Sequence, residues 1–549
     1  MISYQQKISK LKALPRIPLQ DIFMCGIERE AMRVDKQGVI AASGHPKSLG
    51  LALTNDYITT DFAESLLELV TPPFSDTNKL VGFLKSLHSF TATNLGDERL
   101  WPASMPPILP DPENFNIAEY GDSYQGKLRH IYRRGLSIRY GRRMQAIAGV
   151  HFNFSLSPQF QEYYCKMSDE TLDTSTNENK HCRNALYLNI LRNYIRNSWL
   201  INYLFGSSPA IDKSFVQGQE IPDFLQPLGK SSFYNDKSTC LRMGSLGYNN
   251  RKQVELNVCF NNIEEYISTI KRLTTKPDDQ YVAMGLKDTQ GEYQQLNTNL
   301  LQIENEYYAP IRPKAVRRHD QKTLDALMES GTEYLEIRNL DIDPFSPWGI
   351  DEECIRFMQL FLLYLSLEPS PPISREECQA IRKLEDTIVT ANLEADKDFP
   401  FIGDSILNIS DRAESMLTDM QPLAEYLDSC DESGANSYSQ ALSKQREAID
   451  NEKLLPAVRQ LDFLKKSRGA DMAGGVIEGG FIDAMNDLAQ QHQQAYMEYS
   501  QGATYQEFVG DFDKQVEHSR KTEQKILAEQ NGDKSAHQSM DEVIADYLK

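Results

Sequence analysis

The sequence predicts an α+β fold, and two features of its residue pattern carry that prediction. Segments that alternate polar and apolar residues, as strands do, are mixed with helical segments up to about residue 350. From Asp351 onward the apolar spacing becomes helical. The 549 residues are 40% hydrophobic, which is enough to bury a large core. We therefore expect one domain over residues 1–510 with a helical C-terminal part, and a charged, loosely ordered tail over residues 511–549.

Charge and hydropathy exclude some partners. The formal charge is −20, from 78 acidic and 58 basic residues, which works against a surface that tracks nucleic-acid phosphates. The first 20 residues lack the apolar run and cleavage site of a secretory signal, so we expect a cytoplasmic protein. The most apolar stretch, Ile355 to Leu367, is interrupted by Arg356 and Gln359 and is shorter than the ~20 residues of a membrane helix. It predicts a buried helix.

Three other segments and the cysteines complete the outline. Glu376 to Ala391 and Pro456 to Lys466 predict helices, the second with proline where a first turn tolerates it. The polar stretch from Lys166 to Lys180 predicts a solvated loop. The cysteines form no C-x-x-C pair, so buried reduced thiols are expected; they are Cys25, Cys165, Cys182, Cys240, Cys259, Cys354, Cys378 and Cys430.

Polar residues recur on one face of the expected strands, beginning with GIEREAMRV at residues 26–34. Side chains alternate along a strand, so Glu28 and Glu30 share a face. Two close carboxylates repel unless a cation lies between them, and hard oxygen ligands suit Mg²⁺ better than zinc. A solvated amphipathic strand is the alternative, and for an isolated Glu-x-Glu it is the commoner case.

Two further segments repeat the pattern. If the second half of residues 59–73 is extended, Glu64 and Glu68 share a face; an exposed helix with spaced acids is the alternative. In residues 149–155, GVHFNFS, the polar face consists of His151, Asn153 and Ser155, and the opposite, core-facing side of Phe152 and Phe154. Such a histidine is more often a structural hydrogen-bonding group than a metal ligand, although neutral imidazole can bind metals.

The last two segments add cations. In residues 302–314 an extended chain would place Glu304, Glu306 and Tyr308 on one face, followed by Arg312 and Lys314. A solvated run of charges explains that segment equally well.

In residues 333–344 the shared face carries Tyr334, Glu336 and Arg338, backed by Leu335 and Ile337. A salt bridge would account for the charged pair. The same pair also suits phosphoryl transfer, with a glutamate on a metal beside an arginine that neutralises phosphate oxygens.

Together, these strands predict a sheet whose polar face holds divalent ions at a nucleotide-phosphate site. The sequence contains no P-loop, no Rossmann glycine motif, no G-x-S-x-G elbow and no H-E-x-x-H pair, so the commoner enzyme classes lose support.

Seven motifs between Gly26 and Asp351 resemble the bacterial glutamate–cysteine ligase family of the gamma-proteobacterial type. They are GIEREAMRV, TTDFAESLLELVTP, GDERLWPASMPP, GVHFNFS, SLGY, LQIENEYYAPIRPK and EYLEIRNLDIDPFSPWG. The resemblance implies a glutamine-synthetase-like fold, in which a curved, mainly antiparallel sheet with helices outside forms a funnel for Mg·ATP, glutamate and cysteine. It further implies ATP-dependent joining of the glutamate γ-carboxylate to the cysteine amine through γ-glutamyl phosphate, the first step of glutathione biosynthesis.

The resemblance also implies site residues and partners. The metal ligands, for Mg²⁺ with Mn²⁺ as the alternative, would be Glu28, Glu30, Asp61, Glu68, His151 and Glu336. Arg338 would act with Glu336 at the transferring phosphoryl group. The cysteine pocket would consist of Phe62, Tyr132, Leu136, Gln145, Ile147, Asn153, Arg242, Tyr248 and Tyr308. ATP, L-glutamate and L-cysteine would be the partners of a monomer. A related ligase with another amine acceptor, or a non-catalytic metal-dependent binding protein, stays open as an alternative.

Overall fold

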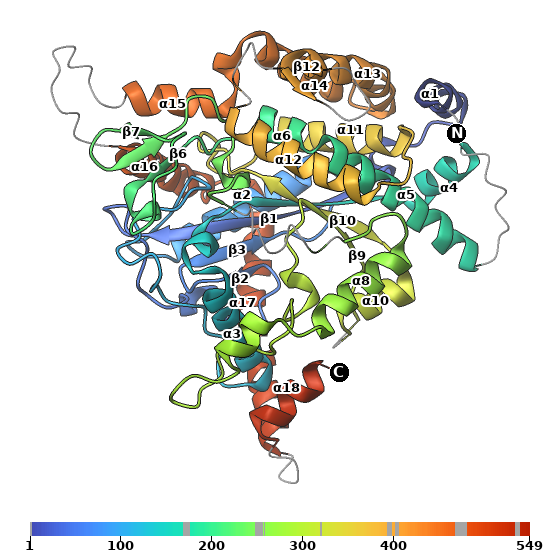
Figure 1. Ribbon diagram of the computed structural model, residues 1–549. Helices are drawn as coiled ribbons and strands as arrows, with labels where there is room; N and C mark the ends of the chain where they lie inside the picture. Colours follow the sequence, from blue (N-terminus) through green and yellow to red (C-terminus); the bar gives the residue numbers. More distant parts are fainter. Residues whose placement is uncertain are drawn as a thin grey trace.

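The computed structural model combines helices with one central antiparallel sheet, in agreement with the expected α+β class (Figure 1). It describes residues 3–167, 176–247, 256, 258–318, 321–391, 393, 398–400, 406–466, 480–532 and 538–548. No helix in these ranges is both long enough and apolar enough to cross a membrane.

The central sheet has the strand order β2-β3-β1-β5-β10-β9, and β4 pairs with the C-terminal end of β1. Every neighbouring pair is antiparallel. Its strands are β1 (Phe23–Val34), β2 (Ile58–Thr60), β3 (Leu66–Val70), β4 (Arg99–Leu100), β5 (Val150–Leu156), β9 (Ile311–Lys314) and β10 (Tyr334–Leu340). The pairing of β1 with both β3 and β5 brings together segments that lie about 40 and 120 residues away in the chain. The strands expected at residues 26–34 and 149–155 are therefore confirmed, and the strand expected at residues 333–344 is confirmed over Tyr334–Leu340.

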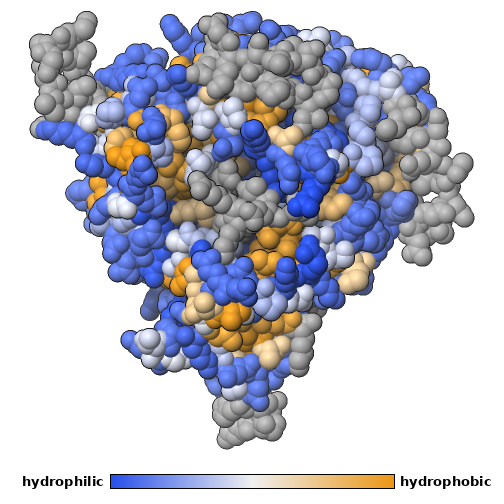
Figure 2. All heavy atoms as spheres, viewed as in Figure 1, coloured by the Kyte–Doolittle hydropathy of each residue, from blue (hydrophilic) through white to orange (hydrophobic). Residues whose placement is uncertain are grey.

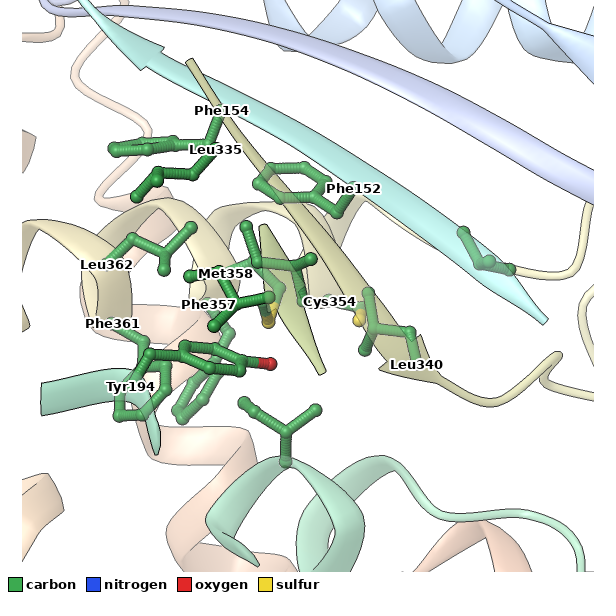
Figure 3. Close-up of a cluster of buried hydrophobic side chains, with 14 of the residues drawn as sticks. Phe152, Phe154, Tyr194, Leu335, Leu340, Cys354, Phe357, Met358, Phe361 and Leu362 are labelled. Carbon is green, nitrogen blue, oxygen red and sulfur yellow. The ribbon is translucent and has the colours of Figure 1, made fainter. Parts of the chain in front are cut away.

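One face of the sheet is apolar. Phe152 and Phe154 on β5 and Leu335 on β10 are fully buried, as the alternation predicts. They face α11 (Glu352–Leu367), whose Met358 and Leu362 lie nearer to them in Figure 3 than Phe361, which lies beside Tyr194. Since α11 is apolar around most of its circumference, it is covered on both sides, which confirms the buried helix expected at residues 355–367.

Helices cover both sides of the central sheet. Five helices contact a strand of the sheet or α11. They are α2 (Thr77–Thr93), α5 (Thr176–Asn197), α6 (Trp199–Phe205), α13 (Ile409–Cys430) and α14 (Ser437–Asp450). Figure 1 shows α6, α11 and α12 (Arg375–Ala391) above the sheet, and α3 (Tyr124–Tyr140), α8 (Ile263–Thr275) and α10 (Thr323–Ser330) below it. The polar face of the sheet is thus the one on the side of the lower helices.

Smaller elements join these layers. They are α1 (Tyr4–Ala13), α4 (Pro158–Met167), α9 (Asp279–Met284), α15 (Pro456–Lys466), a sheet in the order β6 (Ala210–Asp212), β8 (Ser232–Tyr234), β7 (Gln226–Leu228), and a β11 (Asp398–Pro400) and β12 (Ile406–Asn408) pair. The helices expected at residues 376–391 and 456–466 are confirmed as α12 and α15. Figure 2 shows apolar side chains gathered on the lower part of the face it draws, over the region of α3.

Two expectations for this part of the chain are wrong. The loop expected from Lys166 to Lys180 is wrong at its two ends, because Lys166 belongs to α4 and residues 176–180 belong to α5; residues 168–175 lie outside the described part. Cys165 and Cys182, expected as free thiols, form a disulfide, because the packing of α4 on α5 brings their Cα atoms to 6.6 Å. The composition of a local segment does not reveal a contact between two helices, so the sequence did not predict this disulfide.

The segment expected to be a loose tail is also helical where it is described. The helix α17 (Ala503–Gly532) packs with α16 (Phe481–Tyr499) against α2, and α18 (Met540–Leu548) packs on α3. Phe512 of α17 is buried, with ring centroids 5.2 Å from Phe83 and 5.4 Å from Phe90. Most charged residues of α17 are exposed, with Glu523 as a buried exception, so a high overall charge concealed an amphipathic pattern.

Candidate active site

The sheet register brings acidic side chains from three strands, and His151 and Asn153 from a fourth, to the polar face. Glu30 of β1 lies opposite Glu68 of β3, and Glu28 of β1 lies opposite His151 of β5. On the far side of β5, Asn153 lies opposite Glu336 of β10. Residues two apart share a face, so these pairs form one continuous row across the sheet.

Two overlapping groups in this row have the geometry of metal sites. One consists of Glu28, His151 and Glu336, and the other of Glu30, Glu68 and His151, with one ligand atom from each residue within 4.8 Å of the others. His151 belongs to both groups. A donor set dominated by carboxylate oxygens fits a hard divalent cation such as Mg²⁺.

Hydrogen bonds fix the ligands nearest His151. Its Nδ1 lies 3.0 Å from Glu28 Oε2, and its Nε2 lies 3.4 Å from Glu30 Oε1. The Asn153 amide donates to Glu28 Oε1 at 2.8 Å, and the Gly149 backbone N–H donates to Glu30 Oε2 at 2.6 Å. Both carboxylates are therefore oriented before any cation binds.

The acids on the β3 side of the row resist ionisation. Burial, followed by the neighbouring charges of Glu28 and Asp61, raises the pKa of Glu68 well above its ordinary value. Burial also raises the pKa of Glu30, and Asp61 adds to that effect. Buried carboxylates that repel one another are stabilised in their charged form by a cation between them, so the electrostatics of this group fit a metal.

The β10 side of the row is cationic. Glu336 has Arg338 Nη1 at 3.3 Å, Lys314 Nζ at 3.6 Å and Arg312 Nη1 at 3.9 Å. Burial would raise the pKa of Glu336, but the charges of Lys314, Arg338 and Arg312 outweigh it and hold the pKa well below the usual range. Burial likewise acts against ionisation of Glu28, yet the hydrogen bond with His151 lowers its pKa. One end of the site is thus short of positive charge and the other is rich in it.

Asp61, the sixth expected ligand, lies beside the row without belonging to either group. It follows β2, and its carboxylate charge raises the pKa of both Glu30 and Glu68, which places it next to them. Its backbone carbonyl accepts hydrogen bonds from Arg133 and, at 3.1 Å, from the Tyr120 hydroxyl. The structure therefore brings five expected ligands together and leaves Asp61 at the edge.

The residues expected around cysteine lie in two environments. The apolar ones, Phe62, Leu136 and Ile147, are buried in the main core, and Tyr132 packs against it. The polar ones are tied to neighbours: the Gln145 amide donates to the Tyr308 hydroxyl at 2.8 Å. Arg242 donates to the Arg338 carbonyl at 2.9 Å, at the edge of the acidic row, and Asn153 contacts Glu28. Tyr248 lies outside the described residues.

Two acids expected on the polar face lie elsewhere. Residues 304–306 form a 3₁₀ turn before β9, and Glu306 pairs with Arg139 of α3 at 3.1 Å, so the strand expected there is wrong at its beginning. Glu64 lies before β3, where its carboxylate accepts from the backbone amides of His45 and Glu119. Both acids serve tertiary contacts that local alternation does not specify.

Comparison with known proteins decides the family. The family model described as glutamate-cysteine ligase matches residues 8–388. A glutamate–cysteine ligase from Yersinia pseudotuberculosis is 42% identical over 445 residues, which is 80% of this chain and 83% of the relative. This chain belongs to the glutamate–cysteine ligase family. The activity that defines the family, ligation of glutamate to cysteine in the first step of glutathione biosynthesis, confirms the enzyme class expected from the motifs.

Other relatives of this ligase extend the comparison. A glutamate–cysteine ligase from Saccharophagus degradans is 40% identical over 452 residues, covering 82% of this chain and 84% of the relative. The crystal structure of glutamate–cysteine ligase from Francisella tularensis in complex with AMP is similar over 97% of this chain and 99% of that chain, with a TM-score of 0.85 and 28% identity. A bifunctional glutathione synthetase from Pasteurella multocida shares the fold, with a TM-score of 0.66 and 22% identity over 91% of this chain and 55% of that chain.

Two features of the site in this ligase were not expected from its sequence. The Gly149 amide that holds Glu30 is a backbone group, which residue type does not reveal. Asp341, one residue beyond β10, has its Oδ1 3.6 Å from Arg242 Nη1. Asp341 lies in the motif EYLEIRNLDIDPFSPWG, but the strand that carries Glu336 and Arg338 ends before it. The alternation of polar and apolar side chains predicts neither backbone donors nor residues beyond the end of a strand.

A separate cavity of about 660 Å³ lies away from the acidic row. Glu64, Tyr120, His130 and Glu523 are among its lining residues, and none of the six expected metal ligands lines it. The chemistry is concentrated on the strand face, so this cavity does not define the active site.

Proposed function

We propose that the acidic row binds Mg·ATP and that the ligation proceeds through γ-glutamyl phosphate. The observation that carries this proposal is the pair of oxygen-rich groups sharing His151, next to the Arg338, Lys314 and Arg312 cations. Phosphoryl transfer from a nucleoside triphosphate needs both features, namely divalent ions at the phosphates and cationic side chains at the transferring phosphoryl group. The AMP in the Francisella tularensis structure supports a nucleotide site in this fold.

The chemistry requires activation of glutamate. A carboxylate acylates an amine poorly because oxide is its leaving group, whereas an acyl phosphate releases phosphate. Divalent ions, Mg²⁺ or alternatively Mn²⁺, would neutralise the phosphate oxygens when bound by Glu28, Glu30, Glu68, His151 and Glu336, with Asp61 nearby. Arg338 Nη1 lies 3.3 Å from Glu336 Oε1, and this pairing supports a role for the guanidinium in neutralising charge on the transferring phosphoryl group.

The second half-reaction needs a separate pocket. Phe62, Leu136 and Ile147 offer an apolar wall for a small thiol, and Tyr308 is oriented by Gln145. Arg242 is a buried cation suited to the cysteine carboxylate. Attack by the cysteine amine on γ-glutamyl phosphate then forms the amide and releases phosphate, so no enzyme nucleophile is needed.

The wider setting follows from the same proposal. We infer that the open face of the curved sheet lies at the base of a funnel that admits ATP, L-glutamate and L-cysteine. The protein acts in the cytoplasm as a monomer, without nucleic-acid or membrane partners. Because a related ligase could take another amine, acceptor choice depends on the pocket rather than on the acidic row.

Phosphate release tests the proposal. Purified protein with Mg·ATP and glutamate is mixed with cysteine and with a panel of other amino acids, and phosphate and product are quantified. Cysteine should give the highest kcat/KM. Without cysteine, exchange of the β,γ-bridging oxygen of ATP should depend on glutamate. Preference for another amine would reassign the acceptor. Ligation in which no oxygen of the γ-carboxylate reaches the released phosphate would contradict the acyl-phosphate route.

A further inference from the structure

Asp341 is a buried acid whose carboxylate connects the end of β10 to Arg242. Its Oδ2 accepts hydrogen bonds from the Ser207 backbone N–H at 2.8 Å and from the Ser208 hydroxyl at 2.6 Å. Its Oδ1 lies 3.6 Å from Arg242 Nη1. Asp341 is 5% exposed and Arg242 is 2% exposed, so solvent screens the attraction between them only weakly.

Arg242 is held at its backbone as well as at its guanidinium. It lies in a short 3₁₀ turn, Leu241–Met243, and its backbone N–H donates to the Ser208 hydroxyl at 3.2 Å. Its Nη2 donates to the carbonyl of Arg338 at 2.9 Å. Asp341 therefore acts on Arg242 twice, directly through charge and indirectly through Ser208. A planar guanidinium with several fixed contacts can take only one orientation.

Gly149 provides the space beneath that guanidinium. A Cβ atom at position 149 would lie 2.0 Å from Arg242 Nη2 and 2.6 Å from its Cζ, so the guanidinium would have to move from its place. The same glycine exchanges two backbone contacts with Glu30: its N–H donates to Glu30 Oε2 at 2.6 Å, and its carbonyl accepts from the Glu30 N–H at 3.1 Å. The guanidinium thus lies against the backbone that orients a proposed metal ligand.

We infer that Asp341 is a positioning residue that orients Arg242 for the carboxylate of the amine substrate, and that Gly149 allows the guanidinium to lie beside Glu30. The inference rests on the proposed function, in which Arg242 belongs to the cysteine pocket. Bidentate recognition of a carboxylate depends on the plane of the guanidinium as well as on its charge. Asp341 consequently affects the second half-reaction, whereas Gly149 affects both.

Asp341→Asn in the full-length protein tests this assignment. The amide oxygen can replace Oδ2 as the acceptor for Ser207 and Ser208, while the uncharged amide nitrogen replaces Oδ1 beside Arg242. We expect the KM for cysteine to rise about 10- to 100-fold. The KM for glutamate and the rate of ATP oxygen exchange without cysteine should stay within about twofold of wild type. A merely structural loss would lower both half-reactions together.

Two further variants are compared with Asp341→Asn, one as a control and one that should affect both half-reactions. Asp343→Asn is the matched control, because Asp343 follows the same strand but accepts from the Phe345 N–H at 2.9 Å; its cysteine KM should be unchanged. Gly149→Ala should lose cysteine use and oxygen exchange together, because it displaces Arg242 and Glu30.

The outcomes separate this inference from the proposed function. If Arg242→Ala raises the cysteine KM but Asp341→Asn does not, the positioning role is overturned and the pocket stands. If Arg242→Ala leaves the cysteine KM unchanged, pocket and inference fail together. Equal losses in exchange and in cysteine use for Asp341→Asn would make Asp341 structural and overturn the inference. Should Asp341→Asn not fold, Ser208→Ala replaces it: a smaller selective rise in cysteine KM is expected, and no rise overturns the role.

Discussion

At the scale of single residues, the acidic row has two electrostatic ends on one sheet face. Burial and mutual repulsion raise the pKa of Glu68, whereas neighbouring cations hold the pKa of Glu336 low despite its burial. A phosphate chain with divalent ions suits such a gradient: the ions favour the repelling carboxylates, and the phosphoryl oxygens favour the end rich in arginine and lysine.

Replacement of Glu336 by Gln should abolish ligation and leave the fold intact. The substitution keeps the volume of the side chain but removes the charge that the proposed metal site requires and that pairs with Arg338. Turnover at saturating Mg²⁺ and the thermal midpoint are measured together. Glu119→Gln is the control, because that acid is 69% exposed, and it should retain wild-type turnover. Near-normal activity of the Glu336 variant would remove this residue from the proposed ligands.

Arg338→Lys should also be severely impaired, by about 100-fold or more in kcat, because a point charge does not replace a planar fork at the transferring phosphoryl group. The KM for cysteine should change much less than kcat. Steady-state kinetics with each substrate varied in turn provide the measurement. A lysine variant with unchanged turnover would leave Arg338 with a purely structural role.

At the scale of elements, strand pairing determines what the row can do. The register of β1 with β3 sets Glu30 opposite Glu68, and a shift of one residue would turn Glu68 into the apolar core. Between β5 and β10 the register shifts between Ile337 and Leu340, an irregularity of the kind that redirects side chains. Arg338 lies within that stretch, and its backbone N–H donates to the Pro310 carbonyl at 2.8 Å.

The docking of α17 gives a prediction at this scale. Phe512→Ala should destabilise the protein by about 3–5 kcal/mol, because its buried ring contacts Phe83 and Phe90 on α2. Denaturant unfolding monitors the loss. Phe508→Ala is the matched control, since Phe508 is only partly buried, and it should cost less. An unchanged midpoint for Phe512→Ala would show that α17 does not dock on α2 in solution.

At the scale of the whole molecule, the site couples stability to pH and to divalent ions. Glu30 and Glu68 have raised pKa values in the folded protein, so above the ordinary carboxyl range the folded state binds more protons than the unfolded state. Stability without metal therefore falls as pH rises through these pKa values. Glu336 and Glu28 act in the opposite direction, but their stabilisation is lost only as pH falls below that range.

Bound Mg²⁺ should remove this loss, since it binds the ionised carboxylates. The rise in thermal midpoint on addition of Mg²⁺ is expected to be larger at about pH 8 than at about pH 5.5. Midpoints with Mg²⁺ and with chelator, at both pH values, test the expectation. Glu68→Gln should reduce the difference between the Mg²⁺-induced midpoint rises at the two pH values. A midpoint shift that is independent of pH and of Glu68 would contradict coupling through this group.

Local sequence alone determined the strands that carry the row and the helices behind it. Alternation specified that Glu28 and Glu30 share a face and that Phe152 and Phe154 face the core, because strand geometry depends on neighbouring residues only. The same reasoning located α11, α12 and α15. The motifs named the family, and the comparisons confirm it.

Tertiary structure decided which strands are neighbours and which acids reach the open face. Glu306 alternates like a strand residue, yet Arg139 of a distant helix holds it in a 3₁₀ turn. The Cys165–Cys182 bond and the contacts of Gly149 and Asp341 likewise join segments brought together only by packing. Periodicity is a local property of the chain, whereas register, burial and charge pairing depend on partners far away in sequence, so only the folded structure assigns them.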